Sequence, residues 1–244
     1  MNFSRPAAFA AVMFATAGLS PLTAQTTSPS GPTGWLTASH SIVRGGAMPM
    51  LNWEITYPSI VEDYVEITDY STVTAKENLK VEIRVLGAGV TASASNSTTF
   101  SFVPTEALVS YNGSSYGRVF YGTNLNVNPN TIVYSRTVQK DRPLRFGGRY
   151  YYNNAWGPYF NSQSGTRNVR ALVNGDTPPT TYSLINAPTL EQFIRPYLDS
   201  AGRVKIGPMD VIVFMELTHH DSQASDWGYD LQDMVLLVTF KPLN

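Results

Sequence analysis

Apolar and charged residues alternate strictly in one segment of the chain. The order is Leu79, Lys80, Val81, Glu82, Ile83, Arg84 and Val85. A period of two puts the four apolar side chains on one face of a strand and the three charges on the other. The segment therefore predicts a β-strand with one face in the core and one in water.

Further short runs rich in β-branched and aromatic residues predict more strands. They are residues 53–57, 64–67, 107–111, 131–138, 144–152, 169–173 and 180–185. Two Asn-Gly pairs, Asn112-Gly113 and Asn174-Gly175, tolerate the positive φ angles of tight turns and predict antiparallel pairing. Residues 211–217 and 234–240 are almost continuously apolar, as expected for central strands covered on both faces.

Only one segment has helical spacing. Its apolar residues are Leu190, Phe193, Ile194, Tyr197 and Leu198. Thr189 can cap its start and Gly202 can end it, whereas Pro196 favours a short or kinked helix at about residues 188–200. The pattern as a whole predicts an all-β protein, an antiparallel β-sandwich or jelly roll with one short helix.

The N-terminus is typical of a secretory signal peptide. Arg5 precedes an apolar run at residues 7–19, and cleavage is expected after Ala24. The run is shorter than the roughly 20 residues that cross a bilayer as a helix. We therefore predict a signal peptide at 1–24, a flexible leader at 25–34 and a single β-sandwich domain at 35–244. The protein is expected in the periplasm, at the cell surface or outside the cell, with no transmembrane segment after processing.

Net charge and composition limit the classes of molecule that the protein can be expected to bind. The chain has 17 Lys and Arg against 18 Asp and Glu, a net charge of −1, which argues against nucleic-acid binding. It has no cysteine, so stability must come from a packed core. Only 14% of its residues are charged, against roughly 25% in typical soluble domains. The low charge favours a surface that contacts copies of the chain or glycans.

One candidate site combines basic and aromatic residues. The candidate binding residues are Arg145, Arg149, Tyr150, Tyr151, Tyr152, Trp156 and Tyr159. Exposed tyrosine and tryptophan rings beside arginines can stack on sugar rings or anchor a protein partner. The alternative is that these rings fill the core and the arginines cover its edge.

A second candidate site is the acidic connection at residues 219–232, between the apolar segments 211–217 and 234–240. Residues 206–240 contain no lysine or arginine, and the candidate metal ligands there are His219, His220, Asp221, Asp226 and Asp230. Oxygen donors point to calcium as the candidate cofactor, and the histidines to a transition metal or a catalytic site. Adjacent histidines in a strand point to opposite faces, however. The remaining alternative is a solvated acidic loop pinned by Trp227 and Tyr229.

These observations predict an exported binding or structural module, such as a cell-surface, matrix or fibre component. Its expected partner is another copy of the chain or an extracellular glycan or protein. The alternative function is a secreted hydrolase with a metal-assisted or carboxylate-based site near residues 216–233. A pair of carboxylates is sufficient for glycoside hydrolysis, but the spacing of the acidic residues selects no pair.

Overall fold

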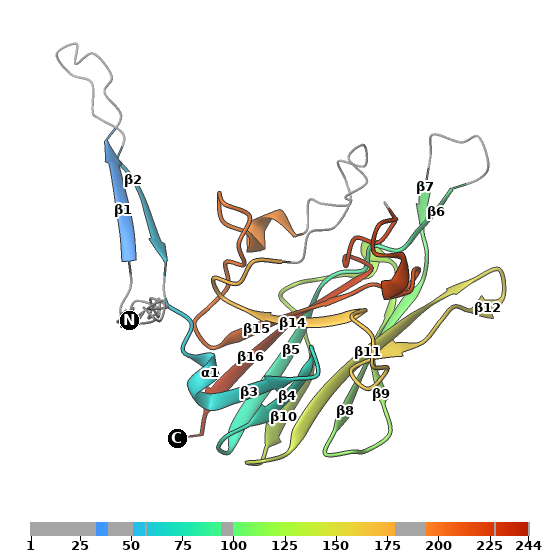
Figure 1. Cartoon of the computed structure of the whole chain (residues 1–244), viewed down its shortest axis with the longest axis horizontal. Helices are drawn as coiled ribbons and strands as arrows, with labels where there is room; N and C mark the ends of the chain where they lie inside the picture. The colour runs from blue at the N-terminus through green and yellow to red at the C-terminus, as the bar shows by residue number, and fades with distance from the viewer. Residues whose placement is uncertain are drawn as a thin grey trace, which may run out of the picture.

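The computed structural model describes residues 33–38, 51–56, 58–93, 100–178, 194–226 and 228–243. In these ranges the chain is nearly all β, with antiparallel sheets and one short α-helix, which confirms the predicted fold class (Figure 1). The predicted signal peptide lies outside the described residues, as do residues 25–32 of the predicted leader and the predicted strand 180–185. Thr33 and Gly34 begin the first strand.

The first large sheet has five strands. In spatial order they are β10 (Ile132–Val138), β5 (Leu79–Gly87), β16 (Met234–Pro242), β15 (Asp210–Met215) and β14 (Val169–Val173). The two apolar segments are β15 and β16, and each has a strand on both sides. Val211, Ile212 and Val213 are all fully buried, so both faces of β15 are covered, as predicted.

The second large sheet is built around one long strand, β11 (Pro143–Tyr152). Its main path is β3 (Val65–Thr68), β4 (Thr72–Ala75), β11, β8 (Thr105–Tyr111) and β9 (Gly117–Gly122). Two short strands, β12 (Ala155–Trp156) and β13 (Phe160–Asn161), also pair with β11. Asn112 and Gly113 have φ angles of 52° and 74° in the turn between β8 and β9, which confirms that predicted hairpin.

Smaller elements complete the described chain. β1 (Thr33–Ala38) pairs with β2 (Leu51–Thr56), and β6 (Thr91–Ser93) pairs with β7 (Phe100–Phe102). The α-helix is α1 (Val61–Tyr64), and three 3₁₀ turns cover Asn124–Asn126, Arg195–Tyr197 and Asp221–Gln223. None of the described helices is both long and apolar enough to cross a bilayer.

The core lies between the two large sheets. Buried side chains from both sheets meet there, for example Ile83 and Leu236 from the five-stranded sheet and Phe146 and Val109 from the other. Leu79, Val81, Ile83 and Val85 all belong to this core, as the alternation predicts. The sandwich is thus held by apolar contacts between sheets, consistent with a chain that has no cysteine.

The opposite face of β5 differs from the prediction at one residue. Glu82 was expected in water but is only 4% exposed. The amines of Lys80 and Lys241 lie 3.0 and 2.7 Å from its carboxylate. These contacts lower the pKa of Glu82 from 4.5 to about 2, with the hydrogen bond from Lys241 as the largest cause.

The predicted helix at 188–200 is described only from residue 194. That part contains a 3₁₀ turn at Arg195–Tyr197 with Pro196 near its start, where a missing N–H costs no hydrogen bond. Residues 188–193, including the predicted cap Thr189, lie outside the described residues. The described α-helix, α1, has no counterpart among the predicted elements.

The outer edge of β14 is already hydrogen-bonded. The N–H of Ala171 donates to the carbonyl oxygen of Tyr70 over 2.8 Å. Tyr70 lies in the turn between β3 and β4, so this bond joins the two sheets along one border. The N–H of Val173 donates to Oδ2 of Asp176 over 2.9 Å.

Candidate functional site

Several candidate binding residues meet on the outer face of the seven-stranded sheet. Leu144 and Phe146 of β11 point into the core. Alternation along the strand therefore places Arg145, Arg149 and Tyr151 on the opposite face. This outer face is where the basic and aromatic residues of the segment come together.

A tight hairpin brings Trp156 onto this face. Asn153 and Asn154 connect β11 to β12 with φ angles of 49° and 59°, which asparagine tolerates better than most residues. The turn pairs Trp156 with Tyr151, and their ring centroids are 5.1 Å apart. Tyr121 of β9 lies 5.9 Å from Trp156 on the other side.

Tyr116 and Tyr159 extend the row of rings, with centroids 5.8 Å apart. Tyr159 crosses the sheet close to Gly147, where a Cβ atom would lie 3.2 Å from its hydroxyl and 2.8 Å from the Cβ of Asn161. Glycine at position 147 thus permits this close approach. Burial raises the pKa of Tyr159, followed by the nearby Tyr116, so the phenol is neutral. We call Tyr116, Tyr121, Tyr151, Trp156 and Tyr159 the aromatic platform.

A buried carboxylate fixes two arginines within the aromatic platform. Glu106 of β8 is 1% exposed, and its two oxygens accept hydrogen bonds from Nε of Arg149 and Nε of Arg118, both over 2.6 Å. The Arg149 guanidinium lies 4.1 Å from the Trp156 ring centroid, and that of Arg118 lies 4.9 Å from Tyr121. Both are close enough for cation–π attraction. The ion pairs thereby set where the guanidiniums sit among the rings.

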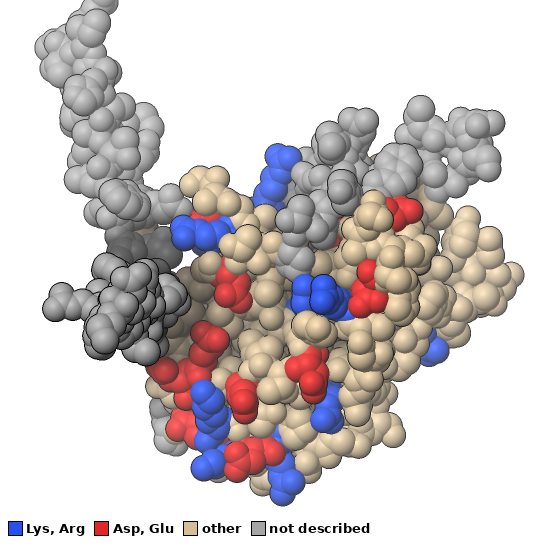
Figure 2. Space-filling view, in the orientation of Figure 1, with Lys and Arg blue, Asp and Glu red and all other residues tan. Residues whose placement is uncertain are grey.

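The aromatic platform is partly open to solvent. Tyr121, Trp156 and Tyr159 are 46%, 37% and 39% exposed. In Figure 2 the part of the surface that carries β12 in Figure 1 has few charged residues. The local surface is thus dominated by uncharged groups around two fixed cations.

Three predicted binding residues lie elsewhere. Tyr150 packs against the core, and Gly157 passes so close to its ring that any side chain at 157 would clash. Tyr152 is exposed but points to the face opposite Tyr151, because neighbouring side chains in a strand alternate. Arg145 lines a separate pocket next to the aromatic platform.

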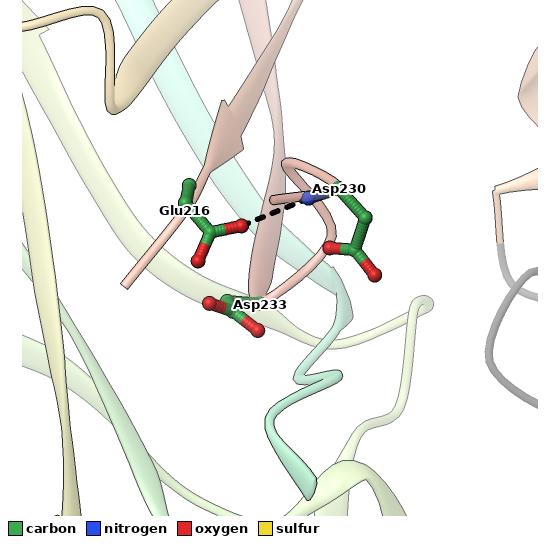
Figure 3. Close-up of side chains that lie close together, drawn as sticks. All are labelled: Glu216, Asp230 and Asp233. Atoms are coloured by element: carbon green, nitrogen blue, oxygen red, sulfur yellow. Dashed lines mark hydrogen bonds between the residues drawn. The ribbon is translucent and has the colours of Figure 1, made fainter. Parts of the chain in front are cut away.

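The acidic connection forms a different cluster from the one expected. Glu216, Asp230 and Asp233 approach each other with carboxylate oxygens all within 4.8 Å, and Glu216 is fully buried (Figure 3). Of the predicted metal ligands, only Asp230 belongs to this group. Three carboxylates at this spacing have the oxygen donors that a calcium ion prefers.

Most of the carboxylate oxygens in this cluster already accept hydrogen bonds. Oε1 of Glu216 accepts from the N–H groups of Thr218 and His219, and Oε2 accepts from the N–H of Asp230. Oδ2 of Asp233 accepts from the N–H of Leu217 over 2.7 Å. Burial, and next the charge of Glu216, raises the pKa of Asp233 well above its ordinary value. Glu216 and Asp233 therefore hold the acidic connection in place. The raised pKa favours a protonated carboxyl group on Asp233.

The other predicted metal ligands diverge. His219 bonds to Oγ1 of Thr218 through Nδ1, and its Nε2 lies 3.8 Å from Asp226. His220 instead lies 2.9 Å from Asp221, which accepts a hydrogen bond from the N–H of Arg167. The two imidazoles do not converge on one point.

Of the two aromatic residues predicted to hold this loop in place, Trp227 and Tyr229, the structure describes Tyr229. Tyr229 is 4% exposed and donates to the carbonyl oxygen of Arg167, and burial raises its pKa to about 12. Trp227 lies outside the described residues.

The residue pattern along the chain does not mark Glu106, Arg118, Tyr116 or Tyr121 as part of a binding site. Glu106 stands in the otherwise uncharged run Thr105–Tyr111, and a lone acid in a buried strand is a signal that a cation lies beside it. Its partners come from two other strands, which the order of residues along the chain does not reveal. Glu216 directly follows the apolar strand β15, and Asp233 directly precedes the apolar strand β16. An acid next to a buried strand is a related signal of a buried polar contact.

A sequence pattern of serine hydrolases also occurs in the chain. Gly113, Ser114, Ser115, Tyr116 and Gly117 match G-x-S-x-G. In those enzymes the serine sits at a turn from a strand into a helix. Here the segment connects the antiparallel strands β8 and β9, so it is a hairpin loop and not a nucleophile elbow. Comparisons with family models, with curated proteins and with solved structures found no match for this chain.

Proposed function

We propose that this chain is an exported binding module that recognises a glycan through the aromatic platform. The observation that carries the proposal is the set of exposed rings of Tyr121, Trp156 and Tyr159 around guanidiniums fixed by Glu106. The signal-peptide pattern at residues 1–24 supports export.

The chemistry of the aromatic platform matches that of a sugar. A pyranose ring has apolar C–H faces that pack on aromatic rings and a rim of hydroxyls that need hydrogen-bond partners. Nε of Arg149 donates to Glu106, and the guanidinium, whose Nη groups are further hydrogen-bond donors, lies beside Trp156. Rings and donors thus lie side by side, as a sugar requires.

Two features support a glycan over a protein as the ligand. The exposed aliphatic residues Ile55, Ile60, Leu125, Ile132 and Leu243 all lie outside the aromatic platform, so the exposed apolar surface there is provided by flat rings, which suit the C–H face of a sugar. The arginines are also already immobilised by Glu106, so a weak ligand does not have to order them.

The hydrolase alternative has less support. A catalytic acid or base must reach the substrate, but Glu216 is fully buried and Asp233 is 6% exposed. Their oxygens accept hydrogen bonds from the backbone N–H groups of Leu217, Thr218 and Asp230, which is a structural task.

Trp156→Ala tests the proposal, with Tyr152→Ala as the matched control from the same hairpin but the opposite face. Affinity electrophoresis against a panel of soluble polysaccharides should show a loss of about 1–2 kcal/mol for Trp156→Ala, a factor of about 5 to 30. Tyr152→Ala should bind like wild type. Both variants should melt near the wild-type temperature, because both rings are substantially exposed.

Light scattering on the same samples distinguishes the rival outcome. If wild type binds no polysaccharide but self-associates, and Trp156→Ala abolishes the association, the surface contacts copies of the chain and the glycan proposal fails. Export is tested separately by mass spectrometry of the protein from its native host. A new N-terminus near Gln25 is expected, and an intact Met1 on the mature protein would contradict it.

A further inference from the structure

A pocket of about 500 Å³, lined mainly by polar residues, opens beside the aromatic platform. It is lined by Asp69, Tyr70, Arg145, Ser162, Gln163 and Gly165. These residues come from the turn between β3 and β4, from β11 and from the loop after β13. The pocket therefore lies on the border where the two sheets are joined.

Hydrogen-bond donors at this pocket lack partners. The Nε atom of Arg145 is buried and makes no hydrogen bond, and the same is true of Nε of Arg170. A buried N–H group without an acceptor is costly. Arg145 lines the pocket, so a ligand with acceptor oxygens there would meet a guanidinium that has no acceptor among the described residues, and the pocket is suited to an oxygen-rich group.

The charges around the pocket are mainly positive. The guanidiniums of Arg170 and Arg167 lie 5.0 and 5.8 Å from the ring centroid of Tyr70. Among the described residues, no carboxylate forms an ion pair with Arg145 or Arg170, whereas Arg167 interacts with Tyr70 and with the charge of Asp221. Asp69 is the one acid that lines the pocket, and it is exposed. A chain with a net charge of −1 thus concentrates three arginines here.

Direct contacts connect the pocket to the aromatic platform. Arg149 lies 5.9 Å from the Tyr159 ring, and Tyr159 contacts Tyr116. The Tyr116 hydroxyl donates to Oε1 of Gln163 over 3.4 Å, and Gln163 lines the pocket. One extended ligand can therefore lie on the rings and reach the arginines.

We infer that the glycan is acidic, with a carboxylate or sulfate group seated in the pocket against Arg145 while neighbouring sugars stack on the aromatic platform. This inference rests on the proposed glycan-binding function and adds the class of glycan. Planar guanidinium groups bind carboxylate and sulfate oxygens in pairs, and the attraction is strongest where the cation has no other partner.

The test compares polymers that share a backbone and differ in charge. Carboxymethyl cellulose is paired with hydroxyethyl cellulose, polygalacturonate with its methyl ester, and dextran sulfate with dextran. Wild type should bind at least one acidic polymer more tightly than its neutral counterpart, and Arg145→Ala should weaken that binding about tenfold or more. Arg142→Ala is the matched control, because Arg142 is an exposed arginine before β11 that contacts Asn112 and not the pocket.

The outcomes distinguish failure of the acidic-glycan inference from failure of the proposed glycan binding itself. Arg145→Ala should keep its melting temperature, because Arg145 makes no hydrogen bond or ion pair with another described residue. Equal binding of neutral and acidic polymers, unchanged in Arg145→Ala, would overturn the acidic class and leave glycan binding intact. An equal loss in Arg142→Ala, or equal retention on polyglutamate, would show attraction by charge alone and also overturn it. If wild type binds no polymer of either kind, the proposed function itself fails.

Discussion

Neutralising Glu106 tests whether the buried carboxylate organises the aromatic platform. In Glu106→Gln both guanidiniums lose their counter-charge, although no ring is removed. Each nitrogen–oxygen contact of 2.6 Å corresponds to a gross attraction of about 6 kcal/mol at an effective dielectric constant of 20. Most of that attraction is offset by the cost of removing the charges from water.

The net loss follows from the exposure of the two cations. Breaking a fully buried ion pair typically costs about 3–5 kcal/mol, because one charge stays buried and unpaired. The side chains of Arg118 and Arg149 are 51% and 33% exposed, so both can regain water. We therefore expect Glu106→Gln to lower the free energy of unfolding by about 2–3 kcal/mol. Affinity for the glycan should also fall, since the arginines are no longer held beside Trp156 and Tyr121.

Urea unfolding measures the first effect and affinity electrophoresis the second. Glu82→Gln is the matched control, because Glu82 is an equally buried carboxylate with cationic partners on the outer face of the other sheet. It should lose stability but keep glycan affinity. Wild-type stability in Glu106→Gln, or an equal loss of affinity in both variants, would refute the reasoning.

Three other expectations concern the core and the acidic cluster. Leu236→Ala should lower the free energy of unfolding by about 2–5 kcal/mol, because Leu236 is fully buried, whereas the exposed Leu125→Ala should change it by less than about 0.5 kcal/mol. The raised pKa of Asp233 means that the folded chain holds a proton that the unfolded chain releases, so stability should fall as the pH rises from about 4 through that pKa. Asp233→Asn should flatten this part of the profile in melting curves, and a slope that is unchanged would contradict the assignment. If the carboxylates of Glu216, Asp230 and Asp233 bind calcium, a concentration one hundred times the dissociation constant should stabilise the fold at neutral pH by about 2.7 kcal/mol, and Asp230→Asn should abolish the effect. A melting temperature that ignores both calcium and chelator would contradict calcium binding.

The sequence predicted those strands whose burial is decided along the strand itself. β5 alternates apolar and charged residues, and β15 and β16 are continuously apolar, so their place in the core can be read directly. β12 has only two residues and exists because the Asn153-Asn154 turn folds Trp156 back onto Tyr151. Such short strands depend on a partner strand and leave no periodic pattern.

The candidate site was predicted in part for a similar reason. The density of tyrosine, tryptophan and arginine after residue 144 pointed to a binding surface, and the structure brings Arg149, Tyr151, Trp156 and Tyr159 together. Their organiser, Glu106, comes from a strand 43 residues earlier in the chain. Contacts across a sheet depend on strand order, which the local sequence does not specify.

The hydrogen-bonded border at β14 has a consequence for assembly. An open edge strand offers unpaired N–H and C=O groups on which another chain can add a strand, which is a common route to fibres and aggregates. Here the amides of Ala171 and Val173 are engaged by Tyr70 and Asp176. At the opposite border β10 lies next to β9 of the other sheet. A second copy that approaches β14 would have to displace a native hydrogen bond before it could pair. Any polymer of this protein should therefore grow through side-chain contacts between intact sandwiches and not by strand addition at β14.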